Sequence, residues 1–151
     1  MGITDDSTWE EIMDAMKTLF PSTFDVLAKL AKSDWSTTGG QTFTWSQSSI
    51  ELSCGTNLGY KQAQSIPINV SGFSTLSYSW SKGDSKGTQY VRLIHTGGTL
   101  NVPSGTGTLD VSSIVGEAYF ILYAKSESYT YNATLYYSSA KTTVTTLRFS
   151  E

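Results

Sequence analysis

The sequence has few of the residues that usually carry chemistry. Its 151 residues include one cysteine, Cys54, and one histidine, His95. A single cysteine excludes an intrachain disulfide, and one histidine does not complete the usual zinc-ligand sets. Only ten residues are basic, charged residues make up 15%, and the net charge is −3, so no electrostatic attraction to nucleic acid or to an anionic membrane is expected. No apolar run approaches the roughly 18 residues that a membrane span needs. We therefore expect no metal, no cofactor, no nucleic-acid partner and no membrane insertion.

Signatures of catalysis are equally scarce. There is no Gly-x-Ser-x-Gly motif, and a serine triad would have to use His95. A glycosidase needs two carboxylates at a set separation, whereas Asp84 and Asp110 lie in segments typical of turns, which an aspartate commonly caps. A calcium site that joins either aspartate to carbonyl oxygens is the alternative. The sequence predicts a protein that is not an enzyme, with a small hydrolase using His95 as the weaker alternative.

Hydroxyl and aromatic side chains are abundant instead. The chain holds 23 Ser, 21 Thr and 9 Tyr. Threonine and tyrosine favour strands, and a chain so rich in hydroxyls and so poor in charge is typical of a β-protein with polar outer faces.

The first part of the chain follows a helical period. From Trp9 to Ala31 apolar residues recur every three or four positions, and Pro21 is expected to end a first helix before a second begins. Two short helices are marginal alone in water, so their apolar stripes need a partner surface. One interpretation is that they cover an end of the sheet domain. The other is an oligomerisation or attachment segment over residues 1–35, with contacts through Trp9, Ile12, Met13, Met16, Phe20, Phe24 and Leu27.

The rest of the chain follows a period of two. After a flexible linker at 36–41, apolar and polar residues alternate along short runs through a domain at 42–151, most cleanly at Leu76, Tyr78 and Trp80. The apolar run Ala118–Ala124 predicts a central strand covered on both faces, and Tyr129–Tyr137 predicts a single further strand. Broken alternation in the final run, 142–149, indicates a bulge. The predicted fold is mainly β: an antiparallel β-sandwich of jelly-roll type preceded by a short N-terminal helical segment.

Aromatic side chains are the best candidates for ligand contact. Tyrosine can stack on the apolar face of a sugar ring while its hydroxyl reaches polar groups. The candidates lie in the later strands and are Tyr90, Arg92, Tyr119, Tyr123 and Tyr136. Core packing or a protein interface are the alternatives for these tyrosines. Cys54 is in phase with apolar neighbours, which predicts burial, and His95 is expected to be a hydrogen-bonded residue at a strand end.

One segment resembles a known group of proteins. In the run from Thr108 to Tyr123, an Asp-x-Ser-x-x-x-Gly turn formed by Asp110, Ser112 and Gly116 leads into a tyrosine-rich strand. It resembles a segment of small jelly-roll domains, similar to carbohydrate-binding modules, in virion proteins of tailed phages and prophages, and the resemblance extends over residues 41–149. Such domains occur in tail, baseplate and head-fibre proteins.

The resemblance implies a non-enzymatic virion structural or appendage protein, assembled in the host cytoplasm. Its helices would attach it to other virion proteins or to copies of itself, by analogy as a trimer. Its displayed sandwich would contact a host cell-surface polysaccharide. A free carbohydrate-binding module is the alternative.

Overall fold

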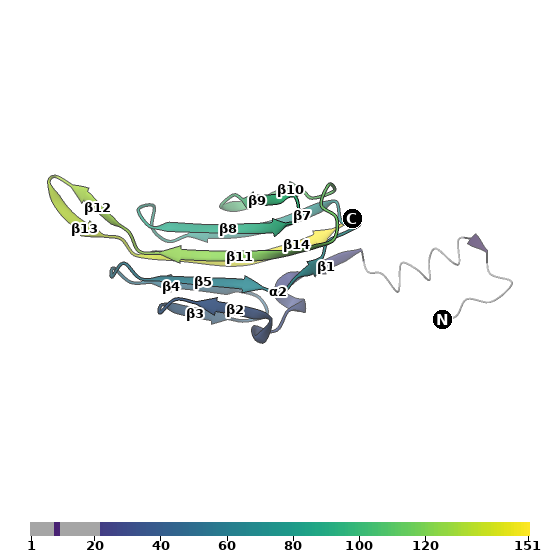
Figure 1. Ribbon diagram of the computed structural model, residues 1–151, viewed down its shortest axis with the longest axis horizontal. Coiled ribbons are helices and arrows are strands. Elements are labelled where there is room, and N and C mark those ends of the chain that lie inside the picture. Colours follow the sequence, from purple (N-terminus) through teal and green to yellow (C-terminus); the bar gives the residue numbers. More distant parts are fainter. Residues whose placement is uncertain (1–7, 10–21) are drawn as a thin grey trace.

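The protein is a sandwich of two antiparallel sheets (Figure 1). The computed structural model describes residues 8–9 and 22–151. Four of the predicted attachment residues, Ile12, Met13, Met16 and Phe20, therefore lie outside the described residues.

The first sheet, called sheet A here, has the strand order β10-β7-β14-β4-β3, with β1 also paired to β14. Its strands are β1 (Thr23–Asp25), β3 (Thr42–Trp45), β4 (Ile50–Cys54), β7 (Thr75–Lys82), β10 (Gly105–Asp110) and β14 (Ala140–Ser150). Sheet B has the order β2-β5-β11-β8-β9, with β6 also paired to β11. Its strands are β2 (Trp35–Thr38), β5 (Tyr60–Ser65), β6 (Ile68–Asn69), β8 (Thr88–His95), β9 (Gly98–Val102) and β11 (Glu117–Lys125).

Three smaller elements complete the described fold. A hairpin of β12 (Ser128–Tyr131) and β13 (Thr134–Tyr137) extends beyond one end of the sheets (Figure 1). Near the opposite end lie the short helix α2 (Val26–Lys29) and the 3-10 helix η1 (Lys32–Asp34).

The core fills the space between the sheets and follows from the period of two. Successive strand residues point to opposite faces, so Leu76, Tyr78 and Trp80 of β7 are all buried, as their alternation predicts. Across the sandwich, the rings of Phe120 in β11 and Phe149 in β14 lie 5.8 Å apart, and neither side chain is exposed. The apolar alternation thus defines the inner face of both sheets.

The predicted bulge is confirmed in β14. The register of its pairing with β7 shifts between Val144 and Thr146. Because of the extra residue, Val144 and Leu147 are both fully buried although three positions separate them.

The prediction for residues 22–35 is wrong in its local structure. Phe24 lies not in a helix but in β1, where it pairs with Phe149 and packs against the core. Leu27 is in a helix, but the helix has four residues, is capped by Asp25, and buries Leu27 in the core at 2% exposure. Tertiary pairing has overridden the helical pattern at Phe24, and both side chains pack in the core of the sandwich. The predicted linker, 36–41, also begins inside β2.

Two further strand predictions need correction. Ala118–Ala124 is central in sheet B, but only its inward residues are buried, and Tyr119, Ile121 and Tyr123 are partly exposed on the outer face. The predicted strand Tyr129–Tyr137 is a hairpin, because the chain reverses at Asn132 and Ala133, whose φ angles are +48° and +61°. Positive φ at both central residues is the geometry of the tight turns that connect antiparallel strands.

The aromatic contact between the sheets can be tested by truncation. Phe149→Ala removes a fully buried ring that also stacks on Phe73 at 5.7 Å, and we expect a loss of about 3–5 kcal/mol in the free energy of unfolding. Urea unfolding followed by tryptophan fluorescence measures this loss. Val115→Ala is the control, since Val115 is 74% exposed and should change stability by no more than about 0.5 kcal/mol. Equal effects of the two changes would contradict the assigned core.

Candidate functional site

The two outer faces of the sandwich carry different side chains. On sheet A, Ser77 and Ser79 of β7 lie opposite Thr108 and Thr106 of β10, and the Ser79 and Thr106 hydroxyls are 2.8 Å apart. This is the hydroxyl face that the composition predicts. The outward positions on the three inner strands of sheet B instead hold several tyrosines, together with glutamine, isoleucine, arginine, lysine, glutamate and one threonine.

A row of stacked side chains crosses three strands of sheet B. It consists of Tyr60 from β5, Tyr123 from β11, and Tyr90 and Arg92 from β8, and we call it the tyrosine row. The ring centroids of Tyr60 and Tyr123 are 6.0 Å apart, and those of Tyr123 and Tyr90 are 4.8 Å apart. Arg92 completes the row, with its Cζ 3.7 Å from the centroid of the Tyr90 ring. Pairing of β11 with both neighbours sets this order.

The rings of the row stand on edge. Tyr123 lies directly opposite Tyr90 on the neighbouring strand, and the two ring planes are 17° apart at a centroid separation of 4.8 Å. At that separation two rings cannot lie side by side in one plane, so they stack face to face in an offset arrangement. Tyr60 flanks Tyr123 on its other side and is the most exposed ring, at 41%. The row therefore presents ring edges and hydroxyls, and little open ring face.

Amide side chains border the row. Gln62 of β5 lies opposite Tyr123, and Asn101 of β9 lies opposite Arg92. The Arg92 Nε donates a hydrogen bond to Asn101 Oδ1 at 3.2 Å. Cation–π stacking on Tyr90 and this hydrogen bond fix the guanidinium plane, and its remaining N–H groups can reach a ligand.

Two shallow depressions lie on either side of Pro67, near the far end of sheet B from the hairpin. One, of about 410 Å³, is lined by Pro67, Ile94, His95, Thr96, Glu117 and Tyr119. The other, of about 480 Å³, is lined by Ser33, Asp34, Ser36, Gln64, Ser65, Ile66 and Pro67. Tyr119 points to the same face as Tyr123, four residues away, or about 13 Å along the strand.

The structure brings together three of the five predicted ligand-binding residues, Tyr90, Arg92 and Tyr123. Tyr119 shares their face, whereas Tyr136 lies in the hairpin, 42% exposed and stacked on Tyr129 at 5.5 Å. Tyr60 is not among the predicted residues. Its signal was weak, because Tyr60 begins a short strand in which alternation is marked only by the buried Ala63 and Ser65.

Asp84, Asp110 and His95 accept hydrogen bonds from backbone N–H groups in turns. Asp110 Oδ1 accepts hydrogen bonds from both the backbone N–H and the hydroxyl of Ser112, which lower the pKa of Asp110. Asp84 Oδ1 likewise accepts from the Lys86 backbone, as its turn position predicts. His95 ends β8, and its Nδ1 accepts a hydrogen bond from the Gly97 N–H, which confirms the strand-end role.

The described part of the chain holds neither a metal-binding cluster nor a membrane-spanning helix. No group of three or more His, Cys, Asp or Glu side chains that could hold a metal ion occurs among residues 8–9 and 22–151. Within those same residues, no helix has the length and apolar character needed to cross a membrane.

The pKa of the Tyr123 hydroxyl is raised. Burial raises its pKa above the ordinary value of 10.0, and the neighbouring Tyr90 and the Glu127 carboxylate act in the same direction. The neutral phenol, which can both donate and accept a hydrogen bond, is thus the form held in the row.

Comparisons with known proteins found weak similarity in structure. No family model and no curated protein matches the sequence. A low-affinity xylan-binding module, CBM86, of the gut symbiont Roseburia intestinalis superposes with a TM-score of 0.35 and 12% identity, over 82% of this chain and 93% of that one. FlhE superposes with a TM-score of 0.31 and 12% identity, over 78% of this chain and 98% of that one. These similarities are too weak to assign a ligand.

The environment of Tyr123 can be tested by titration. Because its folded-state pKa is raised, its contribution to stability is complete below the unfolded pKa of about 10 and is lost as the pH rises through the folded pKa. Ultraviolet absorbance should show a tyrosine that ionises above pH 10.0, and Tyr123→Phe should remove it. In urea, the titrations of the unfolded wild-type protein and of the unfolded Tyr123→Phe variant should differ only by one tyrosine of ordinary pKa. A folded wild-type protein without the late component would contradict the stacked geometry.

Proposed function

We propose that the protein is a non-enzymatic carbohydrate-binding β-sandwich of jelly-roll type, with the tyrosine row as its binding surface. The observation that carries this function is the row itself: three tyrosine rings and a guanidinium group aligned across β5, β11 and β8 on a solvent-facing sheet. The outer face of sheet A carries hydroxyl side chains and the Lys141–Glu51 ion pair instead, so the stacked tyrosines distinguish sheet B.

Strand order supports the jelly-roll type. Eight strands form two sheets of four, β10-β7-β14-β4 and β5-β11-β8-β9. In chain order, every connection among these eight strands except that from β8 to β9 passes from one sheet to the other. Two sheets of four strands joined in this way form a double-sheet jelly roll.

The chemistry of the row suits a sugar. A carbohydrate presents many hydroxyls that both donate and accept hydrogen bonds. The row offers phenol hydroxyls that do the same, guanidinium N–H donors from Arg92, and the amides of Gln62 and Asn101. Tyr60, the most exposed ring, adds apolar surface for the C–H groups of a sugar ring.

Carbohydrate binding can be tested with polysaccharides and matched variants. Tyr60→Ala and Tyr90→Ala should each weaken binding to the recognised glycan about tenfold or more, as the loss of a central aromatic contact does at other interfaces. Tyr137→Ala is the control, because Tyr137 is similarly exposed, at 44%, but lies in β13, away from the row. A glycan array followed by calorimetry measures the affinities. If no glycan binds, or if both row variants bind normally, the function is wrong.

A display role is the second candidate, and the position of residue 22 favours it. The Glu151 N–H donates to the Ser22 carbonyl at 3.0 Å, so residue 22 and the C-terminus lie together. They lie at the pole opposite the hairpin (Figure 1). An attachment segment before residue 22 would therefore leave the outer face of sheet B free, as in an appendage of a virion.

The attachment role can be tested by deletion. Residues 22–35 contribute Val26, Leu27, Leu30 and Trp35 to the core, so only residues 1–21 are removed. If they assemble the protein, light scattering should show a defined oligomer for the full chain and a folded monomer after deletion. A full-length protein that is monomeric at all concentrations would rule out self-assembly through this segment.

A further inference from the structure

We propose, building on the carbohydrate-binding function above, that the hairpin β12–β13 supplies a second contact for the same ligand. The ligand is then a linear, uncharged polysaccharide that runs along β11 from the tyrosine row to the hairpin.

The hairpin has one tyrosine-rich face. Tyr129 pairs with Tyr136, and Tyr131 pairs with Thr134. In an antiparallel pair these four side chains point to one side, while Tyr137 and Leu135 point to the other. The Tyr129 and Tyr136 rings stack at 5.5 Å, and Tyr131 is 64% exposed. We call this side the hairpin tyrosine face.

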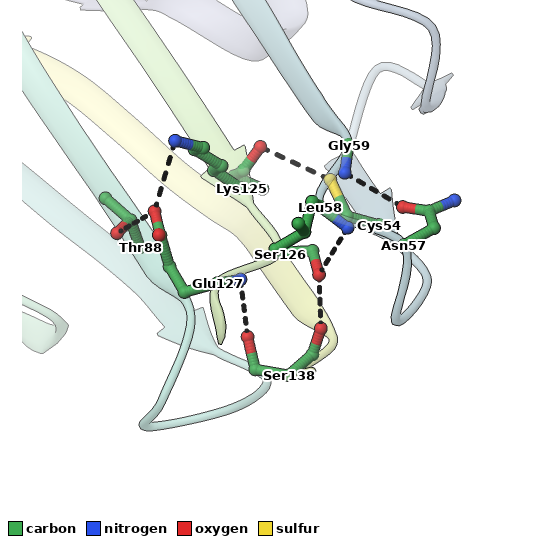
Figure 2. Close-up of polar contacts among 10 residues, drawn as sticks. Cys54, Asn57, Leu58, Gly59, Thr88, Lys125, Ser126, Glu127 and Ser138 are labelled. Atoms are coloured by element: carbon green, nitrogen blue, oxygen red, sulfur yellow. Dashed lines mark hydrogen bonds and ion pairs between the residues drawn. The ribbon is translucent and has the colours of Figure 1, made fainter. Parts of the chain in front are cut away.

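Contacts connect the row with the hairpin tyrosine face on one side of the molecule. Thr88 and Lys125 form the pair next to Tyr90 and Tyr123. The Thr88 hydroxyl donates to Glu127 Oε1 at 3.0 Å, and Lys125 Nζ lies 3.6 Å from the same oxygen (Figure 2). Glu127 therefore points to the outer side, as do the alternate residues Tyr123 and Lys125 before it.

The next step reaches the hairpin itself. Lys86, two residues before Thr88, places its Nζ 5.4 Å from the centroid of the Tyr129 ring. The outer side of sheet B thus continues onto the hairpin tyrosine face. Tyr129 lies six residues beyond Tyr123, at most about 20 Å along an extended strand. A disaccharide is too short to reach both, whereas a polysaccharide chain can.

A buried serine clamp holds the hairpin in place. The Ser126 hydroxyl donates to the Ser138 carbonyl at 2.6 Å and accepts from the Leu58 N–H at 3.0 Å (Figure 2). Ser138 Oγ accepts from the Glu127 N–H at 2.9 Å, and both serines are almost completely buried. An isolated two-stranded hairpin is marginal in water, so this clamp is what orients its tyrosines relative to the row.

The charges along this path favour an uncharged ligand. No charged residue occurs from Ser128 to Tyr137. Between the row and the hairpin, Lys125 and Glu127 neutralise each other. Lys86 and Arg92, which lie over tyrosine rings, would repel a basic polymer.

The test compares chain lengths on matched variants. Wild-type protein is titrated with soluble neutral polysaccharides (a β-glucan, a xylan and a mannan) and with the corresponding disaccharides. Tyr136→Ala should weaken binding of the recognised polysaccharide about tenfold, because a second linked contact is lost, and should leave disaccharide binding unchanged. Tyr137→Ala, with 44% exposure against 42% for Tyr136 but on the opposite face of β13, should change neither. Tyr131→Ala, which disturbs no stacked pair, should repeat the effect of Tyr136→Ala.

The outcomes separate the two levels of the hypothesis. If Tyr60→Ala abolishes polysaccharide binding while Tyr136→Ala and Tyr131→Ala have no effect, the row binds sugar and the hairpin contact is wrong. If none of the three polysaccharides binds and the glycan array is also negative, both are wrong. Tighter binding of polygalacturonate than of the neutral chains, weakened by salt, would overturn the uncharged ligand. A concentration-dependent dimer that Tyr136→Ala dissociates would identify the hairpin tyrosine face as a contact between copies. That result would overturn the proposed contact of the hairpin with a polysaccharide.

Discussion

The alternation of β11 between the two faces of sheet B is the constraint on which the rest of the structure depends. Phe120 and Leu122 point inward and are fully buried. Because the side-chain period of a strand is two, Tyr119 and Tyr123 must then point outward. A slip of one residue would expose the phenylalanine and bury the tyrosines. The packing of the core therefore fixes the register of β11, and that register builds the outer face.

Contacts between the sheets hold β11 at its position. The Thr142 hydroxyl of β14 donates to the Tyr123 carbonyl at 2.7 Å, and the Cys54 thiol of β4 donates to the Ala124 carbonyl at 3.3 Å. Burial raises the pKa of that thiol, so it remains a neutral donor. These bonds, together with the ring contact of Phe120 and Phe149, fix the backbone at the residue that forms the centre of the tyrosine row. A surface fixed in this way loses little conformational entropy when it binds.

Sequence patterns predict the sandwich well where strands are long and one face is buried. Leu76, Tyr78 and Trp80 show this, because alternation and burial coincide in them. The patterns fail where tertiary contacts decide. Phe24 fits a helical period but pairs with Phe149 in a strand. The hairpin was missed because its turn, Asn132-Ala133, lacks the glycine that marks most such turns. For the site, alternation could find Tyr90 and Tyr123 on the outer face, but only the order of the strands shows that Tyr60 joins them.

The geometry of the tyrosine row also determines what kind of binding to expect. A sugar that stacks on an open ring face gains mainly apolar contact, but in the row Tyr123 lies between Tyr60 and Tyr90. A sugar bound at the row would therefore be held chiefly by hydrogen bonds to hydroxyl, amide and guanidinium groups, each of which would replace a hydrogen bond to water. The net gain from each such exchange is about 1 kcal/mol. Binding to the row alone would therefore be weak, and its specificity would depend on how well the sugar hydroxyls match these groups. Weak contacts become strong when several are linked, whether two on one chain, at the row and the hairpin, or many on an assembly of copies.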